Sequence, residues 1–198
     1  MSPITHFLVG WTTFERAQST DRDRALVALA GLAPDLDGLG IVIDFATRTF
    51  GMPETNFYQE FHRVYGHGLP AALMIAGVVA MLAHSRVRAA LCAFVAVHLH
   101  FICDLLGSRG NEPEDLWGIS YLSPFSSAWA VEWSGQWPLV GWQNMLVTAV
   151  LIAWVLARAL RTGYTPLRLV SPLADAALVA VLRKRFGHAR ENPNQPGC

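Results

Sequence analysis

Charged residues are scarce in this sequence, and their scarcity argues against an ordinary soluble domain. Only 15% of the 198 residues are Asp, Glu, Lys or Arg, 53% are hydrophobic, and the mean hydropathy is +0.32. Residues 138–157 carry no charge, and residues 87–106 carry only Arg88 and Asp104. A helix of about 20 residues is roughly 30 Å long, which is enough for one bilayer crossing. The composition predicts a membrane protein with these two segments as its best candidate spans.

The other apolar segments are shorter. Residues 68–83 form an uncharged stretch, and residues 4–14 and 25–33 are shorter still. We expect them to form half-buried or interfacial helices in place of full crossings, so the number of spans stays open.

Cysteine and an excess of basic residues are also lacking. The three cysteines, Cys92, Cys103 and Cys198, are an odd set without ligand-like spacing, which argues against a disulfide framework, and we expect the first two to be small core residues. The 15 basic and 15 acidic residues cancel, so no nucleic-acid partner is expected. No basic residue precedes the first apolar segment, which argues against a cleavable signal and predicts that His6 is kept in the mature chain.

The sequence predicts an all-α fold, a membrane-embedded antiparallel bundle of about five or six helices. Ser2-Pro3, Ser19-Thr20-Asp21 and Ser171-Pro172 are typical helix starts, and Pro34 is expected to stop the second helix. Residues 38–60 are expected to be loop-like, with residues 41–45 as a short helix or an interfacial loop. Residues 1–126 are predicted to form a metal-site core, residues 127–187 C-terminal anchoring helices of the same domain, and residues 188–198 a disordered tail.

Histidines gather in the first half of the chain, together with aspartates. Six of the seven histidines lie in the first hundred residues. Short connections make neighbouring helices antiparallel, which brings several of these side chains to one end of the bundle. A mixture of imidazole and carboxylate is the donor set that zinc selects. The candidate metal ligands are His6, Asp35, Asp37, His62, His67, His100 and Asp104.

His100 and Asp104 are the clearest pair. Four residues apart on a helix, they lie on one face and can reach one ion, although the same spacing also suits an ordinary histidine–carboxylate hydrogen bond. An ionisable pair in an otherwise apolar span is functional by default. His98 points to another face, and we expect it to be a packing histidine bonded to a backbone carbonyl or a carboxylate.

Two further clusters are ambiguous from the sequence. Asp35 and Asp37 follow Pro34 on an irregular turn, where they could bridge two ions, supply one ligand and one general base, or simply cap a solvated turn. Between His62 and His67, Arg63 could bind a phosphate oxygen of a substrate. The alternative for that segment is a polar stretch at the membrane interface.

Four motifs, in this order, carry a resemblance to a known family. THFLVG at 5–10, GLAPDLDG at 31–38, HRVYGH at 62–67 and HLHFICDLLGSRG at 98–110, followed by YLSPFS at 121–126, resemble the bacterial membrane-bound metal-dependent hydrolases described as LexA-binding and inner-membrane-associated. That family is similar, more distantly, to zinc-dependent phospholipase C. The resemblance implies that the seven residues above are metal ligands. The chain differs from the usual motifs of that family at Gly38, Gly66 and Gly68. We expect fewer side chains to hold the metal ligands in place at these positions.

The resemblance implies a zinc-dependent hydrolase of the bacterial inner membrane. We expect one or two Zn²⁺ ions, or another divalent metal, to activate water against a phosphodiester or other ester of a phospholipid-like substrate, with Asp37 as general base. Trp117, Trp129, Trp133 and Trp137 would sit among lipid head groups or form an aromatic belt. The alternatives are a non-catalytic metal-binding or regulatory membrane protein, and a cytochrome-like bundle with His67, His98 or His100 as axial haem ligands.

The charge distribution predicts the orientation in the membrane. Most acidic residues outside the site fall at the metal end of the bundle, and most arginines at the other. Because Lys- and Arg-rich loops stay in the cytoplasm, the metal end should face away from it. Topology reporters fused at the C-terminus and in the loop at 108–137 test this orientation. A cytoplasmic reporter in that loop would contradict it.

Overall fold

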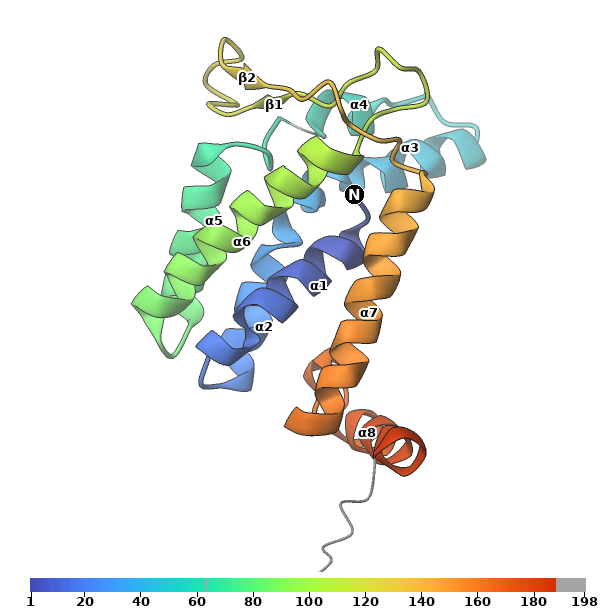
Figure 1. Cartoon of the computed structure of the whole chain (residues 1–198). Coiled ribbons are helices and arrows are strands. Elements are labelled where there is room, and N and C mark those ends of the chain that lie inside the picture. The colour runs from blue at the N-terminus through green and yellow to red at the C-terminus, as the bar shows by residue number, and fades with distance from the viewer. Residues whose placement is uncertain (63, 188–198) are drawn as a thin grey trace, which may run out of the picture. The chain divides into compact units, whose positions relative to one another are not determined.

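The computed structural model describes residues 1–62 and 64–187, without the side chain of Gln59, and it is all-α as expected. The chain forms two compact units, residues 1–151 and residues 152 onward, whose boundary falls inside α7. The helices of the first unit, drawn in Figure 1, are α1 (Pro3–Phe14), α2 (Asp21–Ala30), α3 (Gly40–Thr49), α4 (Phe57–Phe61), α5 (Leu69–Leu82), α6 (Arg86–Gly107) and the start of α7 (Trp142–Thr162). Short 3-10 helices, η1 (Glu15–Ala17) and η2 (Ala33–Leu39), follow α1 and α2.

Helices α1, α2, α5 and α6 pack together as the bundle of the first unit. Small side chains on α6, Ala89, Ala93 and Ala96, are buried against Val27 of α2 and Val79 of α5. Because alanine has a short side chain, the helix axes can approach closely there. Cys92 packs against the same cluster, as expected for a small core residue.

The predicted helix starts are confirmed in atomic detail. The side chain of Ser2 accepts a hydrogen bond from Thr5 N, that of Thr20 from Asp23 N, and that of Ser171 from Ala174 N. Each bond satisfies a backbone donor that has no partner within its own helix.

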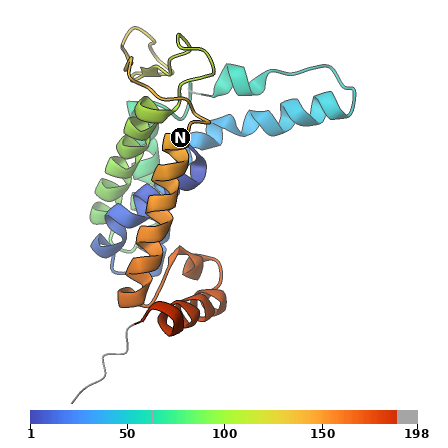
Figure 2. The same cartoon turned by 45° about the vertical axis from the view of Figure 1, so that its right-hand side comes forward.

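The prediction of a loop over residues 38–60 was wrong in part, and its alternative of a short helix at 41–45 is confirmed by α3. Helix α2 ends at Ala30, before Pro34, which lies within η2, and the chain then continues as α3 and α4, which accounts for the helices beyond the expected five or six. Asp44 stabilises this segment, because its buried carboxylate accepts hydrogen bonds from the backbone N–H groups of Phe57 and Tyr58 at 2.9 and 2.8 Å. These bonds pin α4 to α3, and the pair projects from the bundle in Figure 2.

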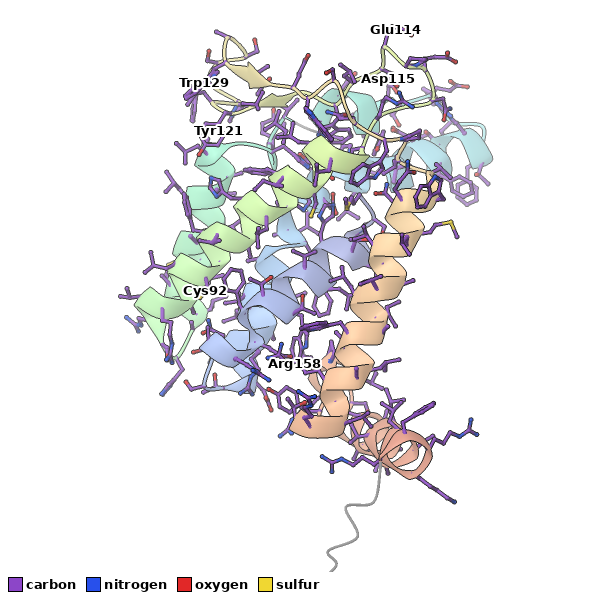
Figure 3. The ribbon with its side chains drawn as sticks, viewed as in Figure 1. Cys92, Glu114, Asp115, Tyr121, Trp129 and Arg158 are labelled. Carbon is purple, nitrogen blue, oxygen red and sulfur yellow. The ribbon has the colours of Figure 1, made fainter. Side chains whose placement is uncertain are left out.

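The long loop after α6 covers one end of the bundle. It contains only the two-residue strands β1 (Ile119–Ser120) and β2 (Ala130–Val131), paired antiparallel. Glu114, Asp115, Tyr121 and Trp129 lie on this side in Figure 3, and Cys92 lies nearer the other end of α6.

The four tryptophans of this loop do not share one environment. Trp129 and Trp133 are exposed, as a position among head groups requires, whereas Trp117 is buried. Trp137 is half-buried and donates a hydrogen bond from Nε1 to Asn144 Oδ1 at 2.6 Å. The expectation of a shared head-group position was therefore wrong for Trp117, which belongs to the interior.

Within the described residues, two helices, α6 and α7, are long and apolar enough to cross a membrane; α6 matches the predicted span at 87–106, and α7 overlaps the one at 138–157 but begins and ends a few residues later. The stretch from α2 through η2 to α3 also passes the same test, but it is bent by 55°. It would be a broken span or a re-entrant segment. Helix α5 has 14 residues and is shorter than a crossing, as expected.

The second unit holds the end of α7, η3 (Pro166–Leu169) and α8 (Pro172–Phe186). The buried carboxylate of Asp175 in α8 accepts hydrogen bonds from the backbone N–H and the hydroxyl of Thr165 at 2.8 and 2.6 Å. Residues 188–198, expected to be a disordered tail, lie outside the described residues.

Candidate metal centre

All seven predicted ligands come together at one end of the bundle, in two adjoining groups. In each group, one potential ligand atom from every residue lies within 4.8 Å of the others. The first, which we call the His100 group, contains His6, Asp35, His100 and Asp104; the second, the Asp37 group, contains Asp37, His62 and His67.

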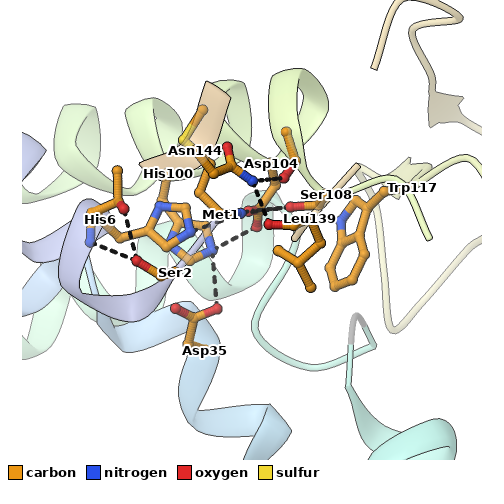
Figure 4. A network of polar contacts seen from close by, with 12 residues as sticks. Met1, Ser2, His6, Asp35, His100, Asp104, Ser108, Trp117, Leu139 and Asn144 are labelled. Atoms are coloured by element: carbon orange, nitrogen blue, oxygen red, sulfur yellow. Dashed lines mark hydrogen bonds and ion pairs between the residues drawn. The ribbon is translucent and has the colours of Figure 1, made fainter. Parts of the chain in front are cut away.

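The His100 group is supplied by α1, η2 and α6 (Figure 4). His100 and Asp104 are one helical turn apart, and His100 Nε2 lies 3.0 Å from Asp104 Oδ2. The ring of His6 stacks on that of His100 with 3.8 Å between centroids, and Nε2 of His6 is 3.1 Å from Asp104 Oδ1. Asp35 Oδ1 lies 3.7 Å from His100 Nε2. Three elements thus direct imidazoles and carboxylates at one point.

The Asp37 group is organised around a single carboxylate. Asp37 Oδ1 lies 2.7 Å from His62 Nδ1, and Oδ2 lies 3.1 Å from His67 Nδ1. The backbone N–H of Gly66 also donates to Oδ2 at 2.9 Å. A carboxylate bonded to Nδ1 fixes the ring and its tautomer, and leaves Nε2 free of a proton. Asp37 therefore orients both histidines.

His67 joins the two groups. Its Nε2 atom lies 3.1 Å from Nε2 of His100 and 3.4 Å from Asp104 Oδ2. Nδ1 of His100 contacts the Gly31 carbonyl at 2.9 Å, and a carbonyl only accepts, so the proton of His100 is on Nδ1. Asp37 has the same effect on His67. The two Nε2 lone pairs would therefore face each other, an arrangement that requires a proton or a cation between them.

The electrostatics of this end of the bundle also call for positive charge. Asp35, Asp37 and Asp104 bring three carboxylates together, and buried carboxylates are costly unless they are paired. The α-amino group of Met1 forms an ion pair with Asp104 Oδ1 and donates to Ser108 Oγ at 2.6 Å. A positively charged nitrogen thus lies against the carboxylate where a metal cation would bind.

The pKa values of His6 and His67, which lie outside the candidate spans, are shifted in opposite directions. Burial lowers the pKa of His6, which favours the neutral imidazole that a metal needs. Burial would also lower the pKa of His67, but hydrogen bonds to Asp104 and Asp37 outweigh it and raise the pKa to about 9. Without a metal, His67 therefore holds the proton that the facing Nε2 atoms require.

The residues present fit a divalent cation. His6 is only 1% exposed, and its Nδ1 atom makes no hydrogen bond within the described residues, while its Nε2 atom contacts Asp104 Oδ1 without the geometry of a hydrogen bond. Asp35 Oδ2 is likewise buried without such a bond in that part of the chain. Buried polar atoms are rarely left unsatisfied, so these atoms indicate a missing partner. Neutral imidazoles with carboxylates are the donors that zinc prefers.

A pocket adjoins the Asp37 group. This pocket, of about 720 Å³, lies between His62 and Val64 on one side and the loop at 118–128 on the other. Of the seven candidate ligands, which we call the donor set, His62 lines this pocket. The ring of His62 is held between Tyr58, stacked at 4.6 Å, and Trp117, edge-on at 5.1 Å.

Three glycines, Gly38, Gly66 and Gly68, lie close to the site or to the backbone beside it. A Cβ atom on Gly66 would lie 2.2 Å from the Pro34 carbonyl oxygen and 2.9 Å from Asp37 Oδ2. One on Gly38 would lie 3.0 Å from His62 Nδ1, and one on Gly68 would lie 3.0 Å from the carbonyl oxygens of Tyr121 and Ser123. Glycine at these positions lets the backbone approach the site closely, in place of side chains that would support it.

Sequence reasoning placed His98 correctly outside the donor set. Its Nδ1 atom bonds to the Phe94 carbonyl at 2.8 Å and its Nε2 atom to the Tyr121 hydroxyl at 3.0 Å. Arg63, the predicted substrate-binding residue, lies outside the described residues.

Several partners of the site were missed, among them Ser108, the Gly31 carbonyl and Trp117. Ser108 donates to Asp104 Oδ1 at 2.8 Å, and its position four residues after Asp104 on the sequence could have indicated it. The Gly31 carbonyl and the ring of Trp117 gave no signal, because their role depends on which elements pack together.

Zinc binding should release protons. At pH 7 the metal-free His67 is protonated, since its pKa is about 9, so a metal at Nε2 must displace that proton. We expect about one proton released per zinc from this residue, and an apparent affinity that rises about tenfold per pH unit until pH approaches 9. Titration calorimetry in buffers of different protonation enthalpy measures the release. The same heat in every buffer would contradict the assignment.

Gly66→Ala should weaken metal binding, because the new methyl group would push the Asp37 carboxylate and His67 out of register. We expect an affinity loss of about 10- to 100-fold, the range seen for disturbed second-shell contacts. Gly77→Ala is the matched control, since a Cβ there would meet nothing within 4 Å. Zinc titrations of both purified variants make the comparison, and equal affinities would refute the close-approach argument.

Comparison with known proteins identifies the family. No curated protein and no solved structure matches the chain. The family described as YdjM inner membrane protein matches residues 1–186, which include every element described above. Its description agrees with the two helices that are long and apolar enough to cross a bilayer. The chain therefore belongs to the YdjM inner membrane protein family.

Proposed function

We propose that this protein is a metal-dependent hydrolase, with zinc as the preferred ion, that cleaves a phosphodiester or other ester of a lipid-like substrate. The observation that carries the proposal is the convergence of buried, incompletely bonded imidazole and carboxylate groups beside a pocket. His6 and Asp35 have buried atoms without hydrogen bonds in the described chain, and His67 and His100 turn their Nε2 atoms to each other at 3.1 Å.

The residues that would hold the ion are His6, Asp35, His67, His100 and Asp104, because their donor atoms face the common centre. A second ion, if bound, would use the Asp37 group. A divalent metal such as zinc supplies Lewis acidity and activates water at neutral pH.

The protein's own groups would orient the ligands and move the proton. Asp37 was expected to be the general base, but both of its oxygens accept hydrogen bonds, from His62, His67 and Gly66 N. We therefore assign Asp37 to positioning the two imidazoles. Asp35 is the better proton acceptor in this proposal, because its Oδ2 atom makes no hydrogen bond in the described chain and lies beside the donor set.

A lipid-like substrate is supported by the surroundings of η2. Leu36 and Leu39, which alternate with the two aspartates, are 58% and 57% exposed. The apolar face continues on α3 with Ile41, Val42 and Phe45. Exposed apolar surface of this kind indicates contact with lipid. The carboxylates would thus lie next to the acyl chains of a membrane substrate, at the end of the bundle that we propose faces away from the cytoplasm.

A non-catalytic metal-binding or regulatory role is the alternative, since the same ligands could hold an ion without turnover. The pocket beside His62 favours catalysis, because a storage or structural site needs no access for a substrate. The haem alternative receives less support. The facing nitrogens of His67 and His100 lie at hydrogen-bond distance, which leaves no room for a macrocycle between the rings.

Metal analysis combined with a hydrolysis assay tests the proposal. Detergent-purified protein should contain zinc and hydrolyse phospholipid or a generic phosphodiester. His100→Ala should lose the metal and lower the rate by at least about 100-fold, because it removes a donor at the centre of the set.

His98→Ala is the matched control, since it removes an imidazole from the same helix but outside the donor set. It should keep both metal and activity. Bound zinc without hydrolysis of any ester would support the non-catalytic alternative, and full activity in metal-free His100→Ala would exclude the proposed mechanism.

A further inference from the structure

The pocket beside the Asp37 group has an unusual lining. Apart from His62 and Val64, its wall is the loop segment from Gly118 to Ala128, which contributes the serines 120, 123, 126 and 127. No Asp, Glu, Lys or Arg side chain lines it within the described residues. A cavity of about 720 Å³ is in the size range of small-molecule sites. Among the described residues, the lining is thus rich in hydroxyl groups and carries no acidic, lysine or arginine side chain.

Two of the four serines make hydrogen bonds to the backbone of the pocket wall, and the other two do not. The buried Ser123 donates from Oγ to the Val64 carbonyl at 2.7 Å, and Ser126 Oγ accepts from Ala128 N at 3.2 Å. These two bonds hold the wall in shape. The hydroxyls of Ser120 and Ser127 make no hydrogen bond within the described chain, so they are available to a ligand as both donors and acceptors.

The lining selects among ligand classes. A quaternary or primary ammonium headgroup is recognised by carboxylates or by a cage of aromatic rings, and this pocket offers one phenylalanine and no described acid. A neutral polyol, whose hydroxyls both donate and accept, matches serine side chains of the same kind. Hydroxyl pairing also discriminates strongly, because an unmatched ligand leaves polar groups unpaired.

The pocket adjoins the candidate ligands at His62 and an exposed apolar side chain at Phe125. His62 connects its inner side to Asp37 through the 2.7 Å contact at Nδ1. Phe125, at its rim, is 85% exposed and offers an apolar contact to lipid. A ligand with its headgroup among the serines would therefore have its ester beside His62 and its apolar part toward the rim.

We propose that the Ser120–Ser127 pocket binds the neutral, hydroxyl-bearing headgroup of the substrate, so that the enzyme prefers glycerol-type phosphodiesters to choline-type ones. This inference rests on the proposed function, because it names the substrate class of the same site. Ser120 and Ser127 are assigned as specificity residues, and His62 marks the side of the pocket on which the phosphodiester lies.

Binding can be measured apart from turnover. The full-length, zinc-loaded protein in detergent is titrated by calorimetry with glycerophosphoglycerol and with glycerophosphocholine, which share the phosphodiester and differ in the headgroup. We expect the glycerol compound to bind at least about tenfold more tightly. Ser120→Ala/Ser127→Ala should weaken it by about three- to tenfold per lost hydroxyl and leave the choline compound unchanged. Ser134→Ala, an exposed serine of the same loop that does not line the pocket, is the control.

Equal binding of the two compounds, binding of neither, or a double variant that still prefers the glycerol compound would overturn the inference. A parallel assay on phosphatidylglycerol and phosphatidylcholine separates it from the proposed function. Hydrolysis of both lipids at equal rates would refute the pocket assignment and keep the hydrolase. Glycerol-selective binding without any hydrolysis would refute the hydrolase and keep the pocket.

Discussion

Buried negative charge at one end of the bundle is the constraint on which the rest of the structure depends. Three carboxylates lie among four imidazoles, and the two most central nitrogens, on His67 and His100, face each other. Isolated charges in a low-dielectric interior cost far more than folding can supply, so positive charge must accompany them. In the metal-free protein that charge is shared between the Met1 ammonium and a proton on His67, whose pKa is raised to about 9. A divalent cation would provide it more completely.

The fold achieves this convergence through close backbone approach. Alanines on α6 bring α2 and α5 near to it, so that the Gly31 carbonyl at the end of α2 can hold His100 in place. Gly66 then passes within reach of the Pro34 carbonyl and donates to Asp37. Side chains at these points would separate the elements by more than a hydrogen bond permits. The small residues therefore permit the close backbone approach that brings the charged residues of the site together.

The break between α2 and α3 decides where the two aspartates lie. In a continuous α-helix, Asp35 and Asp37 would lie about 200° apart around the helix axis. The 3-10 helix η2 instead places Asp35 in the His100 group and Asp37 in the Asp37 group. The same turn exposes Leu36 and Leu39 on the outside. Irregular backbone in a segment of this apolarity is tolerated where it is buried in protein or lines a cavity, and here it carries the two aspartates of the candidate site.

Periodicity and capping chemistry were enough to predict the all-α class, the two long apolar helices and their starts at Ser2, Thr20 and Ser171, because these features depend on neighbours in the chain. The sequence also indicated that the seven candidate residues would gather at one end of the bundle, since His and Asp stand out in an apolar sequence. The order of α3 and α4 was not indicated, because it depends on Asp44 accepting N–H groups 13 and 14 residues away. Nor could the sequence divide the ligands into two groups, show that Asp37 binds Nδ1 of both histidines, or place Trp117 beside them. Those facts depend on contacts between segments distant in the chain, and only tertiary packing fixes which atoms of a side chain face which partner.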